Sequence, residues 1–173
     1  MRSRAGTCLI SPADHRILRV RITKGRDGPA TLTCTRADGT STWVRVSDYF
    51  PIHDIAHYTV ETTLGIPNAF YSLVRDGWNI EDFAVKGVGA KLPHEANLVE
   101  AIVGRLQRDV MPGTELTTDE FNDEVVAVLE GIGNPARRTV TAAELEAMRS
   151  KFRGLLQSYR DLPPGESLAL EFS

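Results

Sequence analysis

The sequence lacks the features that define several large classes of protein. Its 173 residues include only two cysteines, Cys8 and Cys34, which do not form a CxxC pair. A disulfide framework and a cysteine-rich zinc site are therefore not expected. No apolar run approaches the ~18 residues of a membrane span, and no apolar segment of a signal peptide follows the basic residues 1–4. We therefore expect a cytoplasmic protein with no membrane partner.

Neither the charge nor the aromatic content points to a nucleic-acid partner. The net charge is -3, and aromatic residues make up only 7% of the chain, whereas nucleic-acid-binding domains carry a basic footprint. Arginines alternate along the first predicted strands, for example Arg19, Arg21 and Arg45. We interpret them as a solvated face that protects the sheet edges rather than as a phosphate-binding surface. The length suits a single domain, residues 1–173, with a proper core.

Hydrophobic periodicity predicts an α+β fold. Strand-like alternation marks residues 16–23, 30–36 and 42–46, and the Asp38-Gly39 turn signal favours a hairpin between the last two. Residues 167–172 alternate again and are expected to return to this meander as a fourth strand. Between them, helical patterns cover residues 51–64, 68–75, 94–110, 118–130 and 142–160. We therefore predict an antiparallel sheet of about four strands packed against a bundle of four to five helices.

The central predicted helix carries a second stripe of chemically active side chains. His53, His57 and Glu61 recur at a spacing of four, so successive members lie about 6 Å apart along the helix axis. Two histidines at i and i+4 can hold one divalent ion between them. Because side chains lean toward the helix N-terminus, Glu61 is expected to reach either the outer nitrogen of His57 or the ion itself.

This stretch resembles two known motifs. His53-Asp54-Ile55-Ala56-His57 resembles the HExxH motif of zincin metalloproteases, with Asp54 in the place of glutamate. The wider string His-Asp-x-x-His-Tyr-x-Val-Glu resembles a motif of small bacterial proteins with no assigned activity. The zincin resemblance implies that His53 and His57 bind zinc and that Asp54 is the general base. Because aspartate is one methylene shorter than glutamate, metal binding is implied more strongly than proteolysis.

A third protein ligand is expected from the helix predicted at residues 94–110. His94 and Glu95 lie at its start and Glu100 on its flank. We favour Glu95 or His94 as the ligand, although both residues also suit capping of the helix N-terminus.

Two functions remain open at this stage. In the first, the chain is a metal-dependent, hydrolase-like protein acting on a small-molecule or peptide substrate. His53, His57 and Glu61 then bind Zn²⁺ or another divalent ion, and Asp54 and Glu61 are the catalytic candidates. In the second, the chain is a non-enzymatic interaction or regulatory module with a protein partner or a second copy of itself. The histidine and carboxylate cluster is then a buried polar network that holds the fold.

Overall fold

The fold is described from a computed structural model that covers residues 17–47, 50–111 and 113–173. The basic residues 1–4, Cys8 and Arg16, which entered the sequence predictions, lie outside the described residues. Within the described ranges no helix is long and apolar enough to cross a membrane.

Four strands form one antiparallel sheet in the order β3-β2-β1-β4. The strands are β1 (Leu18–Thr23), β2 (Ala30–Thr35), β3 (Ser41–Val46) and β4 (Ser167–Phe172). As predicted, the last strand joins the N-terminal meander, and its Phe172 lies opposite Leu18 of β1. Along β1, Leu18, Val20 and Ile22 are buried while Arg19 and Arg21 are exposed, so only one face of the sheet meets the core.

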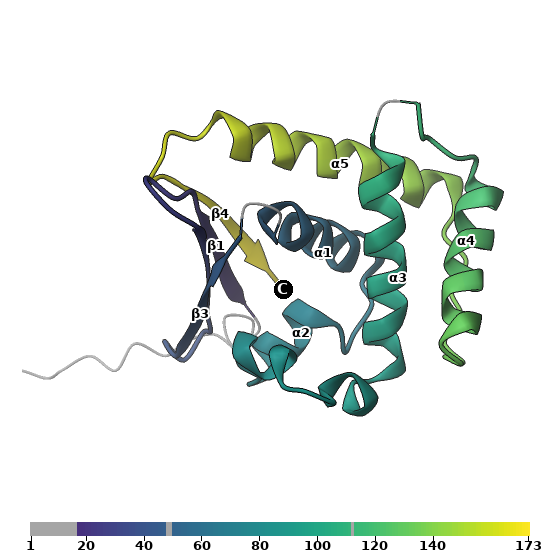
Figure 1. Cartoon of the computed structure of the whole chain (residues 1–173), viewed down its shortest axis with the longest axis horizontal. Helices are drawn as coiled ribbons and strands as arrows, with labels where there is room; N and C mark the ends of the chain where they lie inside the picture. The colour runs from purple at the N-terminus through teal and green to yellow at the C-terminus, as the bar shows by residue number, and fades with distance from the viewer. Residues whose placement is uncertain (1–16, 48–49, 112) are drawn as a thin grey trace, which may run out of the picture.

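The helices occupy the expected parts of the chain and lie on the buried face of the sheet (Figure 1). The α-helices are α1 (Phe50–Leu64), α2 (Phe70–Arg75), α3 (His94–Asp109), α4 (Thr118–Gly131) and α5 (Ala142–Asp161). Two short 3-10 helices, η2 (Ile80–Ala84) and η3 (Val88–Lys91), connect α2 to α3. The predicted α+β class is therefore confirmed. The glycine-containing segment at residues 86–91 contains η3.

Capping boxes set the starts of α4 and α5. The Thr117 and Thr141 hydroxyls accept hydrogen bonds from the backbone N–H groups of Glu120 and Glu144, and each glutamate accepts one in return from the threonine N–H. These reciprocal bonds satisfy amide groups that have no partner within the helix.

Helix α1 lies at the centre of the molecule, between the sheet and the other helices (Figure 1). It packs against both α3 and α5. Its predicted apolar stripe is buried, including Ile55, Ala56 and Val60, but so are His57 and Glu61 on the second stripe. The helix is therefore enclosed on nearly all sides. Helix α3 covers the face on which the histidines lie.

Candidate metal centre

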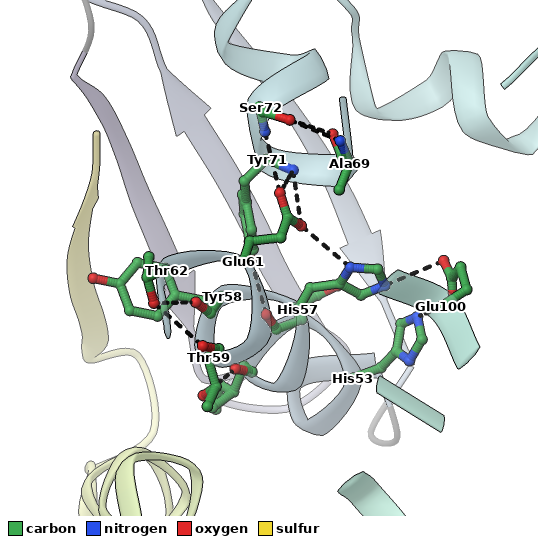
Figure 2. Close-up of polar contacts among 12 residues, drawn as sticks. His53, His57, Tyr58, Thr59, Glu61, Thr62, Ala69, Tyr71, Ser72 and Glu100 are labelled. Atoms are coloured by element: carbon green, nitrogen blue, oxygen red, sulfur yellow. Dashed lines mark hydrogen bonds and ion pairs between the residues drawn. The ribbon is translucent and has the colours of Figure 1, made fainter. Parts of the chain in front are cut away.

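The candidate site joins two histidines of α1 to one carboxylate of α3. His57 Nε2 lies 3.2 Å from Glu100 Oε1, and His53 Nε2 lies 3.7 Å from Glu100 Oε2. Figure 2 shows both imidazole rings directed at the Glu100 carboxylate. One ligand-capable atom from each residue lies within 4.8 Å of the other two, and this is the one such three-residue group in the described ranges.

The outer ring nitrogens are held by other side chains. His57 Nδ1 lies 3.3 Å from Glu61 Oε1, one helical turn further along α1. His53 Nδ1 lies 3.1 Å from Gln107 Oε1 on α3. Since both partners offer oxygen acceptors, each Nδ1–H can donate to its partner, and each Nε2 lies toward Glu100. A histidine fixed in this way through its outer nitrogen is the usual arrangement of a metal ligand.

Glu61 is held from its other side by backbone groups. Its carboxylate oxygens accept hydrogen bonds from the backbone N–H groups of Tyr71 (3.0 Å) and Ser72 (3.3 Å) at the start of α2 (Figure 2). The Glu61 side chain is fully buried. These hydrogen bonds and the contact with His57 compensate the cost of burying its carboxylate. Glu61 thereby fixes the orientation of the His57 ring.

The protonation of the site follows from burial and from the carboxylates. Burial alone would lower the pKa of His57, but the hydrogen bonds to Glu100 and Glu61 outweigh it and raise that pKa to about 10. Burial lowers the pKa of His53, and the charge on His57 lowers it further. The pKa of Glu100 is lowered overall, because its interactions with His57 and His53 overcome its desolvation. Without a metal, the site is thus a His57 imidazolium between two carboxylates beside a neutral His53.

Asp54 lies next to this group but outside its hydrogen-bond network. It is buried, and its Oδ2 atom has no hydrogen-bond partner among the described residues. Burial raises the pKa of this carboxyl to about 7, although the nearby His57 charge pulls it down. A buried carboxyl oxygen without a hydrogen-bond partner is unusual in a folded protein, and the pKa of this group suits transfer of a proton near neutral pH.

The structure brings together some of the predicted residues and not others. His53 and His57 meet as the spacing indicated, and Glu61 reaches the outer nitrogen of His57 rather than the group of atoms that can hold an ion. The carboxylate from α3 is Glu100; His94 and Glu95 do not belong to the group. Sequence spacing on α3 alone did not distinguish these residues, because the choice depends on how α3 crosses α1.

No protein family, curated protein or solved structure in our comparisons matches this chain.

Proposed function

We propose that this chain is a divalent metal-binding protein with hydrolase-like chemistry, in which His53, His57 and Glu100 hold the ion. The observation that carries the proposal is the shared direction of three donors. Two Nε2 atoms and one carboxylate converge on one point from two helices, and the opposite nitrogen of each histidine is held by a separate acceptor.

The donor set fits zinc or a similar ion. Two imidazoles and one carboxylate are a ligand combination of catalytic zinc sites, which keep a further position for water or substrate. Zinc bonds of about 2.1 Å require the three donors to lie closer together than 4.8 Å. Glu100 has room for this movement, because 52% of its side chain is exposed. When bound, the ion supplies Lewis-acid chemistry by polarising an oxygen of the substrate.

The surrounding residues take separate parts in this proposal. Asp54, which is buried beside the ligands and has a pKa near neutrality, is the group that takes up or returns a proton. Glu61 is a positioning residue, because its oxygens are occupied by His57 and by two backbone N–H groups. The catalytic part that the sequence suggested for Glu61 therefore passes to Asp54 alone.

A non-enzymatic role is the second candidate function, and one observation favours it. The His57 imidazolium is already compensated by Glu61 and Glu100 without any metal. A network of this kind can hold α1, α2 and α3 together as a structural unit, and the chain would then act through a protein partner.

Metal analysis of protein purified without a histidine tag separates these functions. We expect near-stoichiometric zinc, manganese or iron in the wild type and little in Glu100→Gln, which removes one anionic ligand. Glu95→Gln is the matched control on the same helix and should retain the metal. Circular dichroism checks that both variants fold.

Absence of metal from the wild type, with none taken up on titration, would refute the metal-binding proposal and favour the structural role. Equal metal loss in Glu95→Gln and Glu100→Gln would refute the assignment of Glu100.

A further inference from the structure

A pocket of about 470 Å³ adjoins the candidate metal centre. Apolar lining comes from the sheet and from η2, including Val44 and Val46 of β3 and Ile80 and Phe83 of η2. The candidate metal centre contributes His53, Asp54, His57 and Glu100 to the lining, which also includes Arg45, Ser47 and Glu81. The size lies within the 300–1,000 Å³ typical of sites for small molecules. The lining combines apolar residues with the polar group of the candidate metal centre, so the pocket is amphipathic.

Aromatic rings extend the apolar wall away from the histidines. The His57 ring lies 5.5 Å from that of Phe70, and the Phe70 ring lies 4.8 Å from that of Phe83. The next ring, Trp78, lies 5.4 Å from Phe83. Such a wall favours an aromatic or branched aliphatic body, since burial of apolar surface and offset ring contacts both stabilise the complex.

At the polar end of the pocket, the Asp54 carboxylate includes a hydrogen-bond acceptor that has no donor. Asp54 lines the pocket, is 95% buried as a residue, and its Oδ2 has no hydrogen-bond partner in the described parts of the chain. The carboxylates of Glu61 and Glu100 lie on either side of His57, so acidic groups outnumber the one cationic ring at this end, while Arg45, the other cation of the lining, belongs to β3. A ligand group that donates hydrogen bonds completes this end, whereas an anionic group is repelled.

We propose that the pocket binds a small molecule with an apolar body and an N–H-donating head, an amine or an amide, which donates to Asp54. The apolar body lies along the Phe70 and Phe83 wall, and the head lies at the end where His53, His57 and Glu100 converge. This inference names the class of substrate for the proposed metal site. It depends on that proposed function only where it places the head of the ligand close to the ion.

The test compares three ligands that share one body and differ in the head: 4-phenylbutylamine, 4-phenylbutanamide and 4-phenylbutyrate. Titrations of the full chain are made at about pH 8.5, where Asp54 is ionised and accepts hydrogen bonds, and in EDTA, so that no metal contributes. They are followed by the fluorescence of Trp78. The variant Trp43→Phe removes the signal of the other tryptophan, which is 56% exposed on the sheet. We expect saturable binding of the amine or the amide, and binding of the carboxylate at least about tenfold weaker.

Two variants divide the interaction into its parts. Asp54→Asn should bring the ratio of affinities between donor and carboxylate heads close to one, because the new side chain both donates and accepts. Phe83→Ala should weaken all three ligands alike, by about tenfold, and leave that ratio unchanged. Ile132→Ala, an exposed position directly after α4 that does not line the pocket, is the control and should change nothing.

The proposal is overturned if neither donor ligand binds, if the carboxylate binds within tenfold of the better donor, or if Asp54→Asn folds and leaves the ratio unchanged. These titrations contain no metal, so their outcome does not depend on metal uptake. The ligand can bind to a protein that takes up no metal, and it can fail to bind to a protein that does. The relative affinity of amine and amide then identifies which head the pocket prefers.

Discussion

His57 carries a positive charge inside the protein because two carboxylates hold it there. Its ring nitrogens lie 3.3 Å from Glu61 and 3.2 Å from Glu100, and these contacts raise its pKa to about 10 against the opposing effect of burial. In the unfolded chain the same imidazole titrates near 6.5. The folded protein therefore retains a proton that the unfolded chain loses between these two values.

This difference predicts how the stability of the metal-free protein depends on pH. The contribution of His57 is fully present below pH 6.5 and is lost as pH rises toward 10, with a slope of up to about 1.4 kcal/mol per pH unit. Urea unfolding in EDTA at several pH values from 6 to 10 measures it. His57→Gln should lose this slope, whereas His53→Gln should keep it. A wild-type slope equal to that of His57→Gln would show that the ring is neutral in the folded state.

At the scale of single residues, the sequence predicted the part of the site that lies on α1. The spacing of His53, His57 and Glu61 depends only on the geometry of a single helix, so it was readable from the chain. Glu100 was not singled out, because its place opposite the histidines is fixed by the crossing of α3 over α1. The orphaned acceptor of Asp54 also has no sequence signal, since burial and the absence of a partner are properties of the folded state.

At the scale of elements, helix α5 depends on a short signal at its start. Thr141 and Glu144 exchange hydrogen bonds between side chain and backbone, and α5 in turn packs on α1 through buried residues such as Phe152. A defect at the cap thus affects a helix that borders the central one.

We expect Thr141→Ala to lower the free energy of unfolding by about 1 kcal/mol, the usual effect of removing a threonine cap. Chemical denaturation measures the change. The same substitution at Thr139, an exposed residue two positions earlier, should cost less than about 0.5 kcal/mol. Equal effects at the two positions would mean that the capping box contributes nothing specific.

The elements themselves were largely predictable because their signals are local. Alternation and turn residues specified the strands, and helical periodicity specified the helices. The burial of the polar face of α1 has no sequence signal, because a helix with polar residues on one face looks amphipathic in the sequence. Only the packed structure shows that the polar face meets α3 rather than water.

At the scale of the whole molecule, β4 ties the last residues to the first strand of the described chain. It pairs with β1 along its length, Phe172 is buried in the core, and the Glu171 carbonyl accepts a hydrogen bond from the Tyr58 hydroxyl of α1. The strand therefore completes both the sheet and the surroundings of the central helix.

Deletion of residues 167–173 should abolish cooperative unfolding, because it exposes the edge of β1 and removes the Phe172 ring. Thermal unfolding followed by circular dichroism tests this, with size-exclusion chromatography to detect association. Glu171→Ala keeps the backbone carbonyl that Tyr58 uses and should unfold like the wild type. A truncated chain that melts as sharply as the full one would show that β4 is dispensable.

The pairing of β1 with β4 also affects the newly made chain on the ribosome. Thr23 and Ser167, which face each other across the two strands, are 144 residues apart in sequence. At a synthesis rate of roughly 5–20 residues per second, one edge of β1 stays unpaired for roughly 7 to 30 s before β4 has been made. During that time it can pair with the strands of other nascent chains. Arg19 and Arg21, exposed on β1, then oppose aggregation by placing positive charge on the waiting strand.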